Sequence, residues 1–274
     1  MLLYLIAPLL LLAAIFLYYG FTIAPWRLRV KNYKLKLSKT LGSFAGKRIV
    51  FFSDIHLGPN FNIQHLQQFC RLILSQKPQL ILFGGDLLEE KTDLSSQSFK
   101  AGIIKELSLL SDFCPCYAVF GNHDVESLKN RQYTTEVIEA SGFIILQNSW
   151  AEIDDLPLYG FENASHDQPE FVDNADLNED SFRLLLCHEP DFVGKVKPVQ
   201  GNSLYLSGHS HGGQVTLFGL PLILPDLGRR YVRGCHQLND KSQLLISNGV
   251  GTVHIHARFC ARPDIIVLDF PEKI

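Results

Sequence analysis

Residues 48–56 read Arg-Ile-Val-Phe-Phe-Ser-Asp-Ile-His, a short apolar run followed by two side chains that can bind a metal ion. Residues 80–86, Leu-Ile-Leu-Phe-Gly-Gly-Asp, repeat this arrangement. Apolar runs of roughly 4–8 residues are typical of buried strands. Each polar cluster therefore follows the end of a strand, which places both clusters on one rim of a sheet.

Three more apolar runs end in the same way. They are followed by Gly-Asn-His-Asp at 121–124, His-Glu-Pro at 188–190 and Gly-His-Ser-His-Gly-Gly-Gln at 208–214. Carboxylate, imidazole and amide groups suit divalent manganese, iron or zinc. The clusters hold enough ligands for two ions, and two ions about 3.5–4 Å apart share a bridging group. We expect Asp86 to be that bridge.

The order and spacing of these clusters resembles the calcineurin-like metallophosphoesterase superfamily, whose signature is D-x-H, G-D, G-N-H-D/E, H and G-H-x-H. The resemblance extends from Arg48 to Phe270. Residues 208–214, 228–231, 248–252 and 262–264 are similar to the membrane-associated bacterial branch of YkuE- and YaeI-like phosphoesterases. That branch includes a UDP-2,3-diacylglucosamine pyrophosphohydrolase of lipid A synthesis.

The resemblance implies a role for each site residue. The first metal ion is expected on Asp54, His56, Asp86 and His211, and the second on Asp86, Asn122, His188 and His209. His123 is expected to stabilise or protonate the leaving oxygen, with Asp124 or Glu89 orienting its ring. The common family residue at position 89 is Asp. Because two bound ions activate water, neither a Ser nor a Cys nucleophile is required.

The N-terminus carries a second strong pattern. Residues 2–26 contain no charged side chain, and such a helix is long enough for a hydrocarbon core of about 30 Å. The lack of Lys or Arg before Arg27 disfavours a cleaved signal peptide. Several basic residues follow the apolar segment, so we expect a single-pass protein of the inner (cytoplasmic) membrane with its catalytic domain in the cytoplasm. The alternative is a buried N-terminal helix, which Pro8 disfavours.

Charge and cysteine content limit the kinds of partner and the compartment that we expect. The eight basic residues between Arg27 and Arg48 have no acidic neighbour, which fits either contact with anionic lipid or an exposed strand or linker. The rest of the chain holds 17 basic and 28 acidic residues, so we expect no nucleic-acid partner. The six cysteines show no regular framework and are expected as free thiols in a reducing compartment.

These patterns divide the chain into a transmembrane anchor (1–26), a basic juxtamembrane connector (27–47) and one catalytic domain (48–274). The predicted class is α/β, and the resemblance implies a four-layer α-β-β-α sandwich of two mixed sheets. Helices are predicted at 63–75, 98–110 and 135–140. Strands are predicted at 48–53, 79–84, 116–120, 158–161, 182–187, 203–207, 214–217, 242–247 and 265–270.

The sequence gives less information about the substrate. Residues 217–225 form an apolar stretch that Gly and Pro prevent from being an ordinary helix or central strand. This stretch is either a lipid-facing loop beside the metals or a buried loop. Arg229, Arg230 and Arg233 are candidates to hold a second phosphate or a nucleotide, or else are surface charges. His254 and His256 alternate, so both rings are expected on one face of an extended segment, either touching substrate or forming a polar sheet face.

Together these patterns predict a membrane-anchored, dinuclear phosphoesterase with a phosphorylated small-molecule or lipid substrate. The best-defined substrate that the resemblance implies is UDP-2,3-diacylglucosamine, cleaved to UMP and 2,3-diacylglucosamine 1-phosphate. The alternatives are a phosphodiesterase or phosphatase of other or broad specificity and a non-catalytic, metal-binding scaffold. We expect manganese as the metal, with iron or zinc also compatible with the ligands. The sequence does not indicate an oligomeric state.

Overall fold

Alternate residues of the central strands face two different cores. In β2 (Arg48–Phe52), Val50 and Phe52 pack toward helices, whereas Ile49 and Phe51 pack toward a second sheet. Strand β3 (Leu80–Phe83) follows the same rule. Both faces of these strands are therefore buried, as their continuous apolar sequences indicate. The computed structural model describes residues 2–35, 43–177, 181–196 and 201–272.

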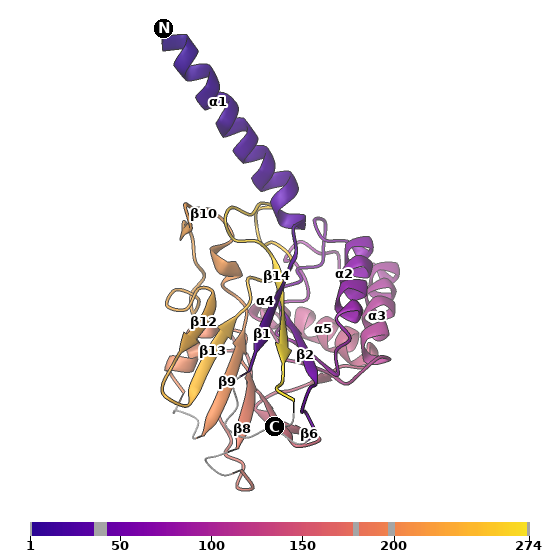
Figure 1. Cartoon of the computed structure of the whole chain (residues 1–274). Helices are drawn as coiled ribbons and strands as arrows, with labels where there is room; N and C mark the ends of the chain where they lie inside the picture. Colours follow the sequence, from indigo (N-terminus) through magenta and orange to yellow (C-terminus); the bar gives the residue numbers. More distant parts are fainter. Residues whose placement is uncertain (1, 36–42, 178–180, 197–200, 273–274) are drawn as a thin grey trace.

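Two six-stranded mixed sheets pack face to face in the described part of the chain (Figure 1). The first has the order β1 (Arg29–Lys34), β14 (Asp264–Asp269), β2, β3, β4 (Cys116–Ala118), β5 (Ile144–Ile145). The second has the order β12 (Gly234–Gln237), β13 (Ser242–Ile246), β9 (Asn202–Ser207), β8 (Phe182–Leu186), β7 (Leu156–Gly160), β6 (Ser149–Ile153). Helices α2 (Ile63–Ser75), α3 (Gln97–Ser111) and α5 (Leu128–Ala140) cover the outer face of the first sheet.

The predicted α/β class with two mixed sheets is confirmed. The outer face of the second sheet is covered differently from the expected helical layer. In the described residues it packs against a 3-10 helix, η3 (Pro190–Gly194), and against loop residues. Phe171 and Phe192 from these segments contact Phe161, so aromatic rings seal this face without a regular α-helix.

Part of the predicted connector 27–47 belongs to the sheet. Arg29–Lys34 forms edge strand β1, parallel to β14. The Nζ of Lys31 lies 2.6 Å from Oδ2 of the buried Asp264, so one of the basic side chains serves an internal ion pair. Residues 36–42, which include the predicted basic residues Lys36 and Lys39, lie outside the described residues.

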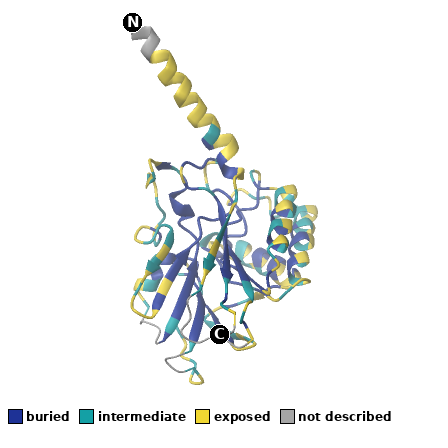
Figure 2. Ribbon diagram, viewed as in Figure 1, coloured by how far each residue is buried: buried dark blue, intermediate teal, exposed yellow. Residues whose placement is uncertain are grey.

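The N-terminal segment projects from the domain as helix α1 (Leu2–Tyr18), followed by η1 (Tyr19–Ile23) and η2 (Ala24–Trp26) (Figure 1). Residues Ile6–Trp26 are long and apolar enough to cross a membrane, and 6% of their most apolar window is buried. Figure 2 shows this exposure along the helix. The alternative prediction, an N-terminal helix buried in the domain, is therefore wrong.

The base of the helix is nevertheless held by the domain. The Phe259 ring contacts Phe16 and Phe21, with ring centroids 4.7 and 5.9 Å apart. The Arg258 backbone N–H donates to the Gly20 carbonyl at 2.9 Å. A Cβ at Gly20 would lie 2.0 Å from the Phe259 ring, so glycine is required for this contact. The helix therefore leaves the domain in a defined direction.

Several short strands were not predicted from the sequence, namely β1, β5, β6, β12 and β11 (Leu220–Pro221). Of the predicted strand 214–217, only Thr216–Leu217 is extended, as β10, and it pairs with β11 in a hairpin. The predicted helix 135–140 is longer and begins at Leu128.

The Asp264 carboxylate links three elements and gives a stability prediction. It accepts hydrogen bonds from Ser247 Oγ at 2.9 Å and from the Asn248 N–H at 3.0 Å, besides pairing with Lys31. Asp264→Asn keeps the shape but removes the charge from a buried pair, so we expect a loss of about 2 kcal/mol in the free energy of unfolding. Urea titration of the detergent-solubilised protein measures this change.

Asp154→Asn is the matched control, because Asp154 forms an exposed ion pair with Lys47 at 3.0 Å. Exposed pairs contribute little, and we expect a change below about 0.5 kcal/mol. Equal losses in the two variants would contradict the structural role of Asp264.

Candidate metal centre

All seven predicted metal ligands lie at the carboxyl ends of strands, on the rim where the two sheets meet. Asp54 and His56 follow β2, Asp86 follows β3, Asn122 follows β4, His188 follows β8, and His209 and His211 follow β9. All but Asn122 are buried. Parallel strands end on the same edge, which is why residues so distant in sequence converge.

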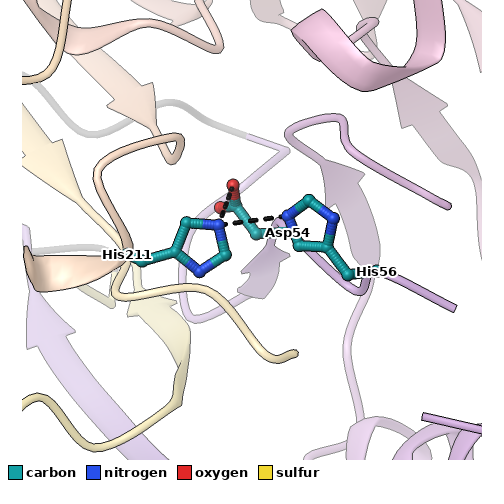
Figure 3. Close-up of side chains that lie close together, drawn as sticks. All are labelled: Asp54, His56 and His211. Atoms are coloured by element: carbon teal, nitrogen blue, oxygen red, sulfur yellow. Dashed lines mark hydrogen bonds and ion pairs between the residues drawn. The ribbon is translucent and has the colours of Figure 1, made fainter. Parts of the chain in front are cut away.

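One group of ligand atoms surrounds the Nε2 of His211 (Figure 3). This nitrogen lies 3.1 Å from Nε2 of His56 and 3.4 Å from Oδ1 of Asp54. Oδ2 of Asp86 lies 3.6 Å from Nε2 of His56. Ligand atoms of Asp54, His56 and His211 all fall within 4.8 Å of one another, which is close enough to contact one ion.

A second group lies on the other side of Asp86. Nε2 of His188 is 3.3 Å from Oδ2 of Asp86, and Nδ1 of His209 is 2.8 Å from Oδ1 of Asn122. Ligand atoms of Asp86, His188 and His209 also lie within 4.8 Å of one another. Asp86 thus contacts residues of both groups, as expected for a bridging carboxylate.

Backbone carbonyls set the protonation of three of these histidines. His56 Nδ1 lies 3.3 Å from the Leu88 carbonyl, His188 Nδ1 lies 2.6 Å from that of Gly84, and His209 Nε2 lies 2.7 Å from that of Asp226. A carbonyl only accepts, so these nitrogens carry the protons and the opposite nitrogens face the site. His188 Nε2 is buried without a hydrogen-bond partner among the described residues. This orientation is the one that metal-binding histidines adopt.

The electrostatics of the site also favour added positive charge. Burial lowers the pKa of His56 to about 3, so this ring is neutral near pH 7. Burial opposes ionisation of Asp86, but His188 and His123 hold its pKa well below the usual value. Burial likewise opposes a charge on His188, yet Asp86 and Asp54 raise its pKa well above normal. Divalent cations would satisfy these carboxylates and the unpaired nitrogens.

The ligand-bearing turns are strained. Asp54, His56, Asp86, His209 and His211 all have positive φ, between 48° and 66°. This region is unfavourable for residues other than glycine, and such strain concentrates at functional sites. The glycines before the ligands permit the tight approach of these turns. A Cβ at Gly121 would lie 2.1 Å from Asp86 Oδ1, and one at Gly208 would lie 2.0 Å from Ser53 Oγ.

Asp124 does not orient His123 as predicted. Its carboxylate accepts hydrogen bonds from the backbone N–H groups of Asp86, Leu87 and Gly121, at 2.7–2.9 Å. Because it faces these amides, it ties two ligand-bearing turns together. The residue beside His123 is Glu126, whose Oε2 lies 3.3 Å from Nδ1. The sequence carried a signal for this contact, since the two are three residues apart at the start of a helix.

Glu89 lies at the edge of the site without a defined partner. Its Oε2 is buried and has no hydrogen-bond partner in the described structure. Burial raises the pKa of this carboxyl. The structure therefore does not support the predicted orienting contact from Glu89 to His123.

Arg258 is a site residue that the sequence reasoning missed. Its fully buried guanidinium donates to the backbone carbonyls of His211, Asn248, Gly249, Gly251 and Ala261. Burial lowers its pKa to about 10, so the group remains charged near neutral pH. Arg258 thereby fixes the turn that carries His211 and the glycine-rich loop that packs on Asp54. No sequence motif marks it, because its partners are main-chain atoms.

The two predicted substrate histidines do not share a face. His254 lines the pocket beside the metal ligands. His256 contacts Thr252 at 3.2 Å and packs on Trp26 with ring centroids 5.1 Å apart. The segment is a turn with positive φ at His254 rather than an extended strand, which explains the difference.

None of the three predicted arginines is among the described residues that line this pocket. Arg229 pairs with Asp226 at 2.8 Å, and Arg230 lies 5.0 Å above the Tyr231 ring. Arg233 donates to the carbonyls of Gly219 and Cys260. The structure thus gives Arg233 a role in holding the 217–225 segment.

The ligand cluster forms the floor of a pocket of about 480 Å³. Its polar end contains Asp86, Asn122, His123 and His209. Its remaining wall is mainly apolar and comprises Val215, Leu222, Ile223, Pro225, Val253 and Ile255 among others. A ligand with a phosphate at one end and a hydrocarbon group at the other fits this division.

Comparison with known proteins agrees with the site. Residues 47–213 match the family described as calcineurin-like phosphoesterase. The uncharacterized metallophosphoesterase YkuE of Bacillus subtilis is 29% identical over 91% of this chain and 88% of its own length. YkoQ of the same organism, also an uncharacterized metallophosphoesterase, is 30% identical over 79% and 81%. The phosphodiesterase YaeI of Escherichia coli is 31% identical over 81% of each chain.

The bridging position of Asp86 gives a prediction about metal content. We expect the full chain, loaded with manganese and then desalted, to retain two ions, and Asp86→Ala to retain fewer than one, because both groups lose their shared ligand. Elemental analysis by mass spectrometry measures both. His166→Ala, at an exposed position, is the control and should keep both ions. Full retention by Asp86→Ala would contradict the bridge.

Proposed function

This chain belongs to the calcineurin-like phosphoesterase family, and we propose that it is a membrane-anchored member that hydrolyses a lipid-linked phosphodiester or pyrophosphate. The family predicted from five ordered motifs is confirmed, and with it a metal-dependent phosphoester hydrolase. The anchor is the segment 1–26. In this proposal it lies in the inner membrane and the catalytic domain faces the cytoplasm, as the basic residues after Trp26 favour.

The observation that carries the proposal is the composition of the pocket. Four of the metal ligands and His123 line its polar part, whereas Leu222, Ile223, Val253 and Ile255 line its apolar part. A purely polar substrate would leave that apolar wall in water. An acyl chain covering it would be stabilised by about 25 cal/mol per Å² of apolar surface removed from water.

The chain's own residues support the reaction in distinct ways. Divalent ions bound to the seven ligands would supply Lewis acidity and an activated water for in-line attack on phosphorus. His123 lines the pocket, and Glu126 lies beside its Nδ1. The carboxylate of Glu126 would stabilise the doubly protonated ring, from which the other nitrogen, Nε2, could pass its proton to the leaving oxygen. Asp124 and Arg258 keep the ligand turns in register through main-chain hydrogen bonds.

The specific substrate that we propose is UDP-2,3-diacylglucosamine, which has two phosphates for the floor and acyl chains for the wall. Cleavage gives UMP and 2,3-diacylglucosamine 1-phosphate, a step of lipid A synthesis. We propose manganese as the metal, because a site of two carboxylates, four imidazoles and one amide accepts it, as it also accepts iron and zinc. One relative with a phosphodiesterase name, YaeI, supports the chemistry, while the acyl specificity depends on the pocket.

To test this substrate, the purified full chain is incubated with manganese and UDP-2,3-diacylglucosamine, and the release of UMP is followed by chromatography. We expect turnover of the diacylated sugar nucleotide and little turnover of UDP-N-acetylglucosamine. Comparable rates on both would favour a phosphodiesterase of broad specificity. Bound metal without hydrolysis of these or of an aryl phosphodiester would favour the scaffold alternative.

We predict that changes at His123 and Glu126 lower the catalytic rate by different amounts. His123→Ala removes the proton donor, and we expect kcat to fall by about 10²–10⁴-fold with the metal content unchanged. Glu126→Gln retains the shape but loses the charge beside Nδ1, so we expect a smaller fall of about 3–10-fold. Steady-state kinetics together with elemental analysis measure both variants. Loss of metal from His123→Ala, or a larger effect of Glu126→Gln, would contradict these roles.

A further inference from the structure

The hairpin β10–β11 exposes an unusual amount of apolar surface. Its exposed residues are Leu217 at 53%, Phe218 at 93%, Leu220 at 73%, Leu222 at 60% and Ile223 at 84%. Several large apolar side chains exposed close together on a protein surface mark an interaction site. The question is therefore which partner covers it.

The tip of the hairpin is built to present one of these side chains outward. Leu217 pairs with Leu220, and the connecting residues Phe218 and Gly219 have φ values of 50° and 88°. Glycine suits such a turn, but phenylalanine in this region is strained. A strained turn that carries a nearly fully exposed aromatic ring is expected at a functional contact.

The base of the hairpin is bonded to the residue that holds helix α1. The Thr216 N–H donates to the Phe259 carbonyl at 3.2 Å, and the Phe259 N–H donates to the Gln214 carbonyl at 2.9 Å. The Phe259 ring in turn packs on Phe16 and Phe21 of the N-terminal segment. Figure 1 shows β10 at the end of the domain from which α1 projects. The base of the hairpin and the base of the helix thus contact the same residue.

One basic side chain lies next to the apolar tip. Arg233 donates to the Gly219 carbonyl at 2.5 Å. In the sequence, Arg27 follows directly after the N-terminal apolar segment, and Arg229 and Arg230 follow the hairpin. An apolar tip with an arginine behind it matches the layering of a bilayer, with hydrocarbon beneath anionic head groups.

We propose that the β10–β11 hairpin inserts into the same membrane leaflet that α1 crosses, as a second and independent membrane contact. Leu222 and Ile223 continue from the hairpin into the pocket wall, so insertion opens the pocket toward the acyl layer. The partner is the phospholipid bilayer. This inference rests on the proposed membrane anchoring and adds a surface by which substrate reaches the metal centre without leaving the lipid.

Depth-dependent fluorescence quenching tests the insertion without relying on catalysis. Three full-length proteins, each with one tryptophan, are reconstituted in phosphatidylglycerol-containing vesicles with lipids brominated at a shallow acyl position. The tryptophan is Trp26 in the first, Phe218→Trp in the second and Phe113→Trp in the third, with the other native tryptophans changed to Phe. Phe113 is also exposed but precedes β4, at the end of the strands opposite the ligands.

We expect Trp26 and the tryptophan at 218 to lose about half of their emission and the one at 113 to be unaffected, since an interfacial segment lies about 5–10 Å into the head-group and acyl boundary. Quenching at 26 without quenching at 218 would overturn the hairpin contact while leaving the anchor intact. Quenching at neither position would overturn both the anchor and the hairpin contact.

Kinetics give a second test of the same contact. Phe218→Ser/Leu220→Ser removes apolar side chains that do not line the pocket. We expect turnover of a vesicle-embedded diacylated substrate to fall at least about 10-fold and turnover of a water-soluble aryl phosphodiester to stay within about 2-fold. Phe113→Ser/Ile144→Ser is the control, because these two apolar side chains are also exposed, at 53% and 54%, and lie at the opposite end. Equal vesicle rates for the two double variants would overturn the proposal.

Discussion

The structure depends on bringing carboxylates and imidazole nitrogens together on a buried rim, where only cations can balance them. His56 and His211 face each other at 3.1 Å, and His188 directs a nitrogen without a hydrogen-bond partner in the described structure toward Asp86. Much of the surrounding chain serves this convergence. Five ligands have strained backbone angles, Asp124 binds two turns together, and Arg258 holds the turn that bears His211. Such strain persists only where the neighbouring structure over-determines it.

The same end of the molecule joins the chemistry to the membrane in our proposal. Phe259 links three features, because its backbone pairs with the hairpin, its ring packs on the base of α1, and its neighbour Arg258 fixes the metal turns. In this proposal the anchor would do more than raise the local concentration of enzyme at the lipid. It would set the direction in which the pocket faces, and the apolar pocket wall would continue the hydrocarbon phase toward the metal centre.

The sequence predicted the elements that are stabilised by interactions between residues close together in the chain. Helix α2 has the predicted bounds, since Asn62 caps its first turn and its apolar residues recur at helical spacing. The expectation that the polar clusters share one rim followed from their positions after buried strands, and the family resemblance implied which seven residues are the ligands. Arg258 was missed because its partners are main-chain carbonyls, which no sequence motif marks, and strand β1 was missed because its partner strand β14 lies far along the chain. The shared face expected for His254 and His256 was wrong because a turn with positive φ at His254 replaces the extended segment, and His256 packs on Trp26 instead.

Anomalous X-ray diffraction from crystals of the full chain grown with manganese tests the central claim most directly. Our account predicts two anomalous peaks about 3.5–4 Å apart, one on each side of the Asp86 carboxylate, with His56 and His211 beside the first and His188 and His209 beside the second. A single peak that does not contact Asp86, or manganese bound only elsewhere on the protein, would contradict it.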